Sequence, residues 1–459
     1  MKKALTLLLA LVMVLSLVAC STANQTTTGS KNDPTTKPTT GNTTVPGTTA
    51  QPTEPTQHPT TAPTEPAPTE PAPSNPIEPD NDFNEIVIVD NAHCTFKIVD
   101  ITADSMYYNL KVYLENKSSV TQMFSWNAVT VNNYMIDPFW ACDLGAGNNT
   151  YSEISFLLSE FESNGIVEAT KIEFTMHIYD YDSWDAQDFF NEVCTIYPLG
   201  EDAFVDDGGY TAQEGDIVLV DNEHVTAIVT NFDPNGFWGY TMHLYLENKT
   251  STNLTFSAND VTINNLMLDP WWATEVAAGK RTHCEVFWFS SDFDKYQITE
   301  VTIIDFFLSA SDPMDWESAD LANTHCTVYP MGEEAAKCYD RTELDTDIVL
   351  LDNEYVTITI VSLGYDEYMS YVMELFIESK VDYTVRISAE QVTLNTSEID
   401  PWWAATVSGG KCVYSTISWF GSDLEFYGIT IVESISMNMQ IFDEEAWEPF
   451  ITQDVIVNP

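Results

Sequence analysis

Short runs of branched and aromatic residues dominate residues 84–459, and no sustained helical stripe of apolar positions interrupts them. The run Thr241–Leu246 alternates polar and apolar residues with a period of two, which turns one face of a strand inward. In the middle of the chain the pattern predicts strands over 217–220, 225–230, 240–246, 254–257, 261–263, 284–289, 301–308 and 326–329. Turn residues at 233–236, 248–250 and 278–280 separate several of them. Short helices are predicted only over 183–192 and 315–323.

The strand pattern occurs three times in one register. The run Ile86–Asn91 returns as Ile217–Asn222 and again as Ile348–Asn353, each 131 residues after the last. Each copy holds seven or eight short strands in roughly 115 residues, which is typical of a Greek-key sandwich. The chain is therefore predicted to be all-β, with three tandem immunoglobulin-like β-sandwich domains. Their predicted bounds are 84–200, 215–332 and 346–459.

A different pattern occupies residues 1–20. Lys2 and Lys3 precede an apolar stretch that is too short to cross a bilayer, which takes about 20 residues. The stretch ends in Leu17-Val18-Ala19-Cys20, which resembles a bacterial lipobox. We expect a lipoprotein signal peptide whose Cys20 receives the acyl anchor. The alternative is an ordinary secretory signal that has a cysteine near its end by chance.

Residues 21–83 are rich in Thr and Pro, and Pro-Thr-Glu-Pro recurs at 52–55, 63–66 and 68–71. The segment has too few apolar residues to offset its ordering entropy, so we predict a disordered Thr/Pro-rich linker. In the extended polyproline conformation it would reach on the order of 200 Å at most. That length suits a spacer that carries the domains across a thick cell wall.

Together these features resemble surface lipoproteins of Gram-positive bacteria. The resemblance rests on the lipobox, the Thr/Pro spacer and domains that contain Leu-Glu-Asn-Lys, Val-Thr-x-Asn and Asp-Pro-aromatic-aromatic motifs. It implies immunoglobulin-like domains of the telokin-like class, which have no assigned activity. It also implies an extracellular, lipid-anchored location, and it supplies no catalytic residues.

The formal net charge of −53 narrows the set of partners. Such a surface repels phosphate backbones, so nucleic acid is excluded as a partner and the only membrane contact expected is the lipid anchor. The aromatic share of 12% is too high for a disordered acidic protein. The sequence therefore predicts folded cores under an acidic surface.

Seven cysteines remain besides Cys20, and an odd number argues against a complete disulfide framework. A disulfide that belonged to the fold would recur in all three copies, and none does. Free thiols that behave as small apolar groups are the main expectation. One pair, Cys94 with Cys194, could instead bridge the first and last strands of the first copy.

The Asp-Pro-aromatic-aromatic motif is the main candidate for ligand binding. Exposed rings beside a carboxylate could stack on sugars, or the same rings could simply cap the sandwich core. The candidate residues are Asp137 and Trp140, then Asp269, Trp271 and Trp272, then Asp400, Trp402 and Trp403.

Carboxylates near 180–185, 312–317 and 443–445 could hold Ca²⁺, but their spacing is irregular and a solvated acidic loop is the preferred interpretation. No metal and no cofactor are predicted.

The sequence gives little support for an enzyme, because it contains no G-x-S-x-G, no H-E-x-x-H, no P-loop and no paired C-x-x-C motif. We expect a non-catalytic surface protein that acts in adhesion or captures a glycan or protein ligand. The alternative is a structural spacer that positions a partner at the cell surface. Capture predicts exposed aromatic patches on equivalent faces, whereas a spacer predicts buried aromatics and tight junctions at 201–214 and 333–345.

Overall fold

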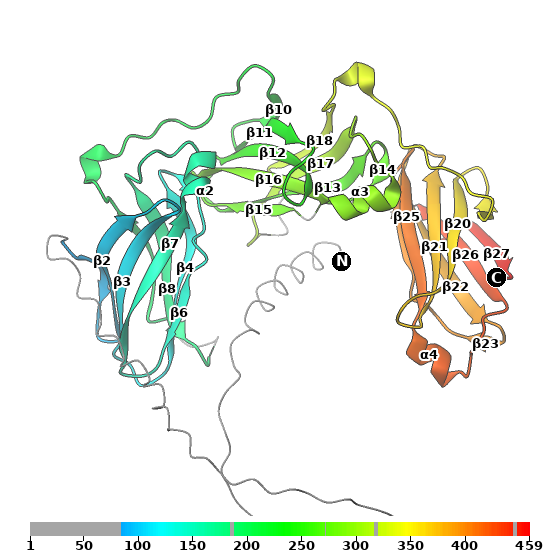
Figure 1. Ribbon diagram of the computed structural model, residues 1–459, viewed down its shortest axis with the longest axis horizontal. Helices are drawn as coiled ribbons and strands as arrows, with labels where there is room; N and C mark the ends of the chain where they lie inside the picture. The colour runs from blue at the N-terminus through cyan, green and yellow to red at the C-terminus, as the bar shows by residue number, and fades with distance from the viewer. Residues whose placement is uncertain (1–83, 184–187, 271, 316–319, 444–447) are drawn as a thin grey trace, which may run out of the picture. The chain divides into compact units, whose positions relative to one another are not determined.

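The structure is a computed structural model that describes residues 84–183, 188–270, 272–315, 320–443 and 448–459. Strands make up most of these residues (Figure 1), so the predicted all-β sandwich fold is confirmed. The predicted signal peptide, Cys20 and the linker over 21–83 lie outside the described residues. Within them, no helix is both long and apolar enough to cross a membrane.

The first repeat consists of two sheets that enclose a common core. One sheet has the order β1-β2-β3-β7 and is antiparallel throughout, with strands Ile86–Asp90, Cys94–Ala103, Tyr107–Asn116 and Asn149–Leu157. The other has the order β5-β4-β8-β9 with β6 paired to β4. Its strands are Gln122–Val131 (β4), Tyr134–Met135 (β5), Ala141–Leu144 (β6), Ile172–Asp180 (β8) and Phe190–Ile196 (β9).

The other two repeats reproduce this order. In the second repeat, the first sheet contains β10 (Ile217–Asp221), β11 (Val225–Asp233), β12 (Gly239–Asn248) and β16 (Arg281–Phe289). The second sheet contains β13 (Leu254–Ile263), β14 (Leu266–Met267), β15 (Ala273–Val276), β17 (Ile304–Ser311) and β18 (Ala322–Val328). In the third repeat, the first sheet contains β19 (Ile348–Asp352), β20 (Val356–Tyr365), β21 (Tyr371–Ser379) and β25 (Cys412–Trp419). The second sheet contains β22 (Val385–Leu394), β23 (Ser397–Glu398), β24 (Ala404–Val407), β26 (Ile435–Asp443) and β27 (Ile451–Val457).

Several strand bounds differ from the sequence prediction, which also missed β14 and β15 and divided one strand into two. The segments 254–257 and 261–263 are a single strand, β13, whose pairing with β17 shifts between Asn259 and Thr262. Asp260 sits in this bulge with φ +52°. The bulge inserts an extra residue and breaks the period-two pattern, so one strand looks like two in the sequence.

The helices also differ from the prediction. The described parts of 183–192 and 315–323 contain turns and strand but no helix. Short helices of six or seven residues instead follow the last strand of the first sheet in each repeat: α2 (Leu158–Ser163), α3 (Ser290–Tyr296) and α4 (Gly421–Phe426). Phe161 and Leu424 on α2 and α4 are buried, so each helix covers one end of the core. A helix of six or seven residues is too short to produce a helical stripe in the sequence.

Each core contains large side chains from both sheets. Phe156, Trp288 and Trp419 occupy the same position of the repeat and are almost completely buried. The indole N–H groups of Trp288 and Trp419 donate to the carbonyls of Leu268 and Ile399, at 2.9 and 3.2 Å. Apolar burial of this kind is the main stabilising contribution to each repeat.

Candidate functional site

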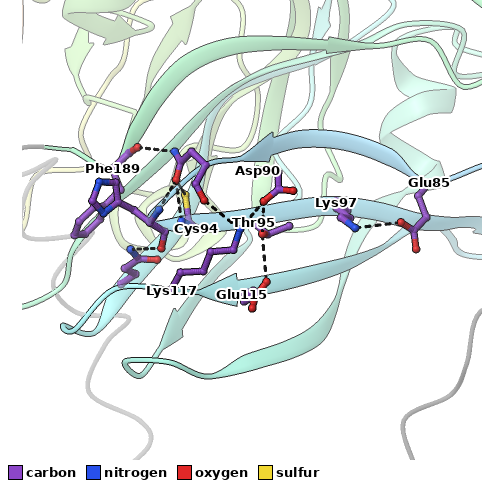
Figure 2. A network of polar contacts seen from close by, with 11 residues as sticks. Glu85, Asp90, Cys94, Thr95, Lys97, Glu115, Lys117 and Phe189 are labelled. Atoms are coloured by element: carbon purple, nitrogen blue, oxygen red, sulfur yellow. Dashed lines mark hydrogen bonds and ion pairs between the residues drawn. The ribbon is translucent and has the colours of Figure 1, made fainter.

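Each of the three repeated runs ends in an Asp-Asn pair, at 90–91, 221–222 and 352–353, which is called the Asp-Asn motif. In the first repeat this motif forms a polar network at the start of the first sheet (Figure 2). In the first repeat, Nζ of Lys117 lies 2.5 Å from Oδ1 of Asp90 and donates to the Asn91 carbonyl at 3.1 Å. The Thr95 hydroxyl also donates to Asp90, at 3.0 Å. The hydrogen bond from Lys117 holds the pKa of the Asp90 carboxyl below its usual range.

The same network recurs in the other two repeats. Lys249 contacts Asp221 at 2.7 Å and the carbonyl of Asn222 at 2.9 Å. Lys380 likewise contacts Asp352 and the carbonyl of Asn353. Every contact stays within one repeat. Nδ2 of Asn91 also donates to the carbonyl of Phe189, just before β9 of the second sheet, at 3.3 Å. The Asp-Asn motif is therefore part of how each sandwich folds.

The Asp-Pro-aromatic-aromatic motif forms a tight turn in the second sheet. Oδ1 of Asp137 accepts the backbone N–H of Phe139 at 2.8 Å, and Oδ1 of Asp400 accepts that of Trp402 at the same distance. Both aromatic residues have positive φ, +47° and +51°. The aspartates thus fix the turn. Asp269 is exposed at the equivalent position of the second repeat.

The two aromatic residues of the motif have opposite environments. Phe139 and Trp402 are 85% and 92% exposed, whereas Trp403 is 8% exposed and belongs to the core of the third repeat. Trp140 and Trp272 pack against their cores, and Trp140 and Trp403 donate their indole N–H to Ser152 and Ser415. Trp271 lies outside the described residues. The turn therefore does not present two adjacent rings to a ligand where both rings are described.

The acidic segments give no metal site among the described residues, where no group of three His, Cys, Asp or Glu side chains could hold an ion. Asp180 and Asp312 each accept the backbone N–H two residues on, at 3.0 and 2.8 Å, which caps a turn. Parts of these segments, at 184–187, 316–319 and 444–447, lie outside the described residues.

The second repeat carries an aromatic face that the motif search does not find. Along β16, Val286 and Trp288 point into the core, while Glu285, Phe287 and Phe289 alternate with them on the outer side. The turn before β12 adds Phe237 and Trp238, which are 92% and 55% exposed. These four aromatic residues, Phe237, Trp238, Phe287 and Phe289, are called the aromatic face below.

The loop of the aromatic face is held by specific contacts. Oδ1 of Asp233 accepts the backbone N–H of Asn235 at 2.8 Å, and the Trp238 carbonyl accepts that of Ser290 at 3.1 Å. A Cβ on Gly239 would lie 2.1 Å from the Trp288 carbonyl oxygen. Only glycine allows this close approach, so Gly239 lets the loop bring Trp238 over β16.

The four rings contact one another. Trp238 and Phe287 are near-parallel at 26°, with ring centroids 6.4 Å apart. Phe289 stands almost perpendicular to both, at 80° to Trp238 and 82° to Phe287. The ring centroid of Phe237 lies 4.8 Å from that of Trp238. Contacts of this kind fix the rings in place before any ligand arrives, which lowers the entropic cost of binding.

Polar groups border the aromatic face. In the register of β12 and β16, Thr241 lies opposite Phe287 and His243 opposite Glu285. Nδ1 of His243 is 3.7 Å from Oε1 of Glu285, and both side chains are partly exposed. Rings with hydrogen-bonding groups alongside them suit a ligand with both apolar faces and hydroxyl groups.

The equivalent face of the other repeats is less aromatic. Ser155 and Ser418 replace Phe287, and Leu157 and Phe420 replace Phe289. The face is therefore a property of the second repeat and not of the shared fold, so it does not meet the prediction that capture would place exposed aromatic patches on equivalent faces of the copies. The sequence shows that Phe287 and Phe289 fall on the same side of a strand. It does not show that a turn places Trp238 beside these two rings, and that placement is what forms the aromatic face.

The repeats are joined by a junction that occurs twice. The first sheet of the second repeat joins the second sheet of the first repeat, where β16 pairs with β5 in parallel. The first sheet of the third repeat joins the second sheet of the second repeat in the same way, through β25 and β14. The backbone N–H of Arg281 donates to the Asn133 carbonyl at 3.1 Å, and that of Cys412 to the Asn265 carbonyl at 3.0 Å.

A lysine reinforces each junction. Lys280 reaches Glu173 at 2.5 Å and Oδ1 of Asn133 at 3.3 Å. Lys411 reaches Asp305 at 3.7 Å and Oδ1 of Asn265 at 3.2 Å. The equivalent positions that make no junction in this chain differ: Asn148 stands at the lysine position in the first repeat, and Thr396 and Ser436 stand at the acceptor positions in the third.

All seven described cysteines are free thiols. Cys94 is buried and Cys194 is half-buried, so the alternative disulfide between them does not form in this structure. Cys338 is exposed, so it does not behave as the small buried apolar group that was expected of the free thiols.

No protein family model and no curated protein matches this sequence. Function is therefore inferred below from the geometry of the chain itself. The two features that carry that inference are the aromatic face and the repeated junction.

Proposed function

We propose that this chain is a non-catalytic, lipid-anchored surface protein that captures neutral glycans through the aromatic face. The observation that carries the proposal is the group of four ordered, partly exposed rings on the second repeat. Exposed apolar clusters with polar borders mark interaction sites on soluble proteins. The anchor at Cys20 is part of the proposal, and fatty-acid labelling that persists in Cys20→Ser would contradict it.

Charge and ring chemistry favour a neutral sugar ligand. The net charge of −53 disfavours anionic polymers as ligands. Aromatic rings offer flat apolar faces for the C–H groups of a pyranose, and the carboxylate of Glu285 and the ring of His243 can exchange hydrogen bonds with hydroxyl groups.

Substituting Phe287 by serine is expected to reduce glycan binding by roughly five- to thirtyfold, because one buried aromatic contact contributes on the order of 1–2 kcal/mol. Repeats one and three already carry serine at this position, so the sandwich tolerates it. Binding of the soluble segment 84–459 to a neutral-glycan array, followed by titration calorimetry, measures the loss.

Trp238→Ala should weaken binding to a similar degree. Trp402→Ala is the control, because Trp402 is also an exposed tryptophan, at 92% against 55% for Trp238, but lies in the third repeat. If Phe287→Ser and Trp238→Ala both bind like the unchanged protein, the aromatic face is not the site. If no neutral glycan binds at all, glycan capture itself fails.

A second candidate function, a rigid spacer that positions a partner at the cell surface, is favoured by the repeated junction. Lys280 is 9% exposed and contacts the preceding repeat through both Glu173 and Asn133. Such contacts restrict the motion of one repeat against the next, whereas flexible linkers would not.

Lys280→Ala is expected to uncouple the first and second repeats. Removing one partner of a partly buried ion pair costs about 1–3 kcal/mol of coupling, less than for a fully buried pair. In calorimetry, a single unfolding transition of these repeats should split into two. Lys249→Ala, which removes a lysine that contacts only its own repeat, should leave the transitions joined. Unchanged coupling in Lys280→Ala would count against the rigid spacer.

A further inference from the structure

Two cysteines meet the same residue at the junction between the second and third repeats. Nδ2 of Asn265 lies 3.0 Å from Sγ of Cys338, and Sγ of Cys412 lies 3.5 Å from the backbone oxygen of Asn265. Cys338 belongs to the linker after the second repeat, and Cys412 begins β25 of the third. The two thiols are thus 74 residues apart in sequence but border one asparagine.

The first junction shows what these two positions do. Asn133 corresponds to Asn265, and its Nδ2 donates to Asp206, 73 residues later, as Asn265 does to Cys338. The backbone N–H of Arg281 binds the Asn133 carbonyl as that of Cys412 binds the Asn265 carbonyl. Asp206 and Arg281 therefore hold the positions of Cys338 and Cys412, and they form an ion pair across the junction.

We propose that Cys338 and Cys412 form a disulfide under oxidising conditions, as the covalent counterpart of the Arg281–Asp206 ion pair. Formation of the bond requires the amide of Asn265 to release Cys338, so that its sulfur can move to that of Cys412. A bond at a junction need not recur in every repeat, which explains why neither cysteine has a counterpart in the other copies. The bond would tie the third repeat to the linker that precedes it.

The chemistry needs an oxidant, for which a small-molecule disulfide suffices. The exposed Cys338 loses its proton, and its thiolate attacks the oxidant to give a mixed disulfide and one free thiol. Cys412, as its thiolate, then attacks the Cys338 sulfur and releases the second thiol. The two cysteines lose two protons and two electrons, and the oxidant is reduced to two thiols.

Burial sets the rate of the second step. It raises the pKa of the Cys412 thiol to about 12, so little thiolate is present at neutral pH. Ring closure should therefore quicken as the pH rises toward that value, and the mixed disulfide at Cys338 should accumulate first.

The test is peptide mapping of the full-length protein after exposure to oxidised glutathione, with free thiols then blocked by iodoacetamide. Lys337 and Lys411 directly precede the two cysteines, so trypsin releases 338–341 and 412–459 with one cysteine each. The expected product is these two peptides joined, lighter by two hydrogens than their sum. It should be absent after reduction.

Cys338→Ser should abolish the joined peptide, and Cys142→Ser, a control in the first repeat, should retain it. Oxidation should also raise the melting temperature of the unchanged protein by about 5 °C or more, and leave that of Cys338→Ser unchanged. Folded, oxidised protein in which both peptides carry only alkyl or glutathione groups would overturn the proposal. So would a bridge from either cysteine to a different partner.

Discussion

Trp403→Ala is expected to lower the free energy of unfolding of the third repeat by about 3 to 5 kcal/mol, the usual cost of deleting a buried tryptophan. The indole is 8% exposed and packs in the core, and its N–H donates to Oγ of Ser415 at 2.9 Å. The substitution leaves a cavity and removes the partner of that hydroxyl. Chemical denaturation followed by tryptophan fluorescence and circular dichroism measures the loss.

The adjacent residue supplies the control. Trp402 is 92% exposed, so Trp402→Ala should change the free energy of unfolding by no more than about 0.5 kcal/mol. Trp403→Phe keeps most of the volume and should fall between the two. Equal effects of alanine at 402 and 403 would show that the two rings do not have the different environments described here.

Asn248→Ala is expected to destabilise the second repeat by about 2 to 4 kcal/mol, because several buried polar groups lose their partner at once. The side chain is fully buried, and its Nδ2 donates to the carbonyls of Thr252 and Val276 at 2.8 and 2.9 Å. Its Oδ1 accepts the N–H and the hydroxyl of Thr250. Thermal unfolding by calorimetry measures the shift of the second-repeat transition.

Asn253→Ala is the matched control, because Asn253 is exposed and its hydrogen bonds compete with water. A change within about 0.5 kcal/mol is expected there. The third repeat has Ser379 in place of Asn248, and its hydroxyl makes one long bond to Val381. If Asn248→Ala unfolds at the same temperature as the unchanged protein, the asparagine does not organise this loop.

Several features of the fold follow from the sequence alone. Period-two alternation locates most strands because side chains of a strand face opposite sides in turn. The 131-residue spacing reveals the repeats because equal cores need equal positions, as at Phe156, Trp288 and Trp419. What the pattern misses is short or irregular. The bulge at Asp260 interrupts the alternation, and helices of six or seven residues are too short to establish a period.

The motifs were visible in the sequence, but their roles were not. Asp137 and Asp400 recur because each caps a turn, and Trp403 recurs at a buried position. A repeated residue is compatible with packing or with binding, and only its exposure separates the two. The structure leaves the first aromatic residue of the turn in solvent where it is described, so ligand contact at Trp402 stays a hypothesis.

The sequence by itself determined the all-β class, the repeat register and the acidic surface, because these depend on local alternation, on internal similarity and on composition. Only the tertiary structure decided which aromatic rings gather into one face, since Trp238 and Phe287 belong to different segments. It also decided that Cys338 and Cys412 border the same asparagine. Contacts between residues far apart in the chain arise from strand pairing and repeat docking, which local sequence patterns do not encode.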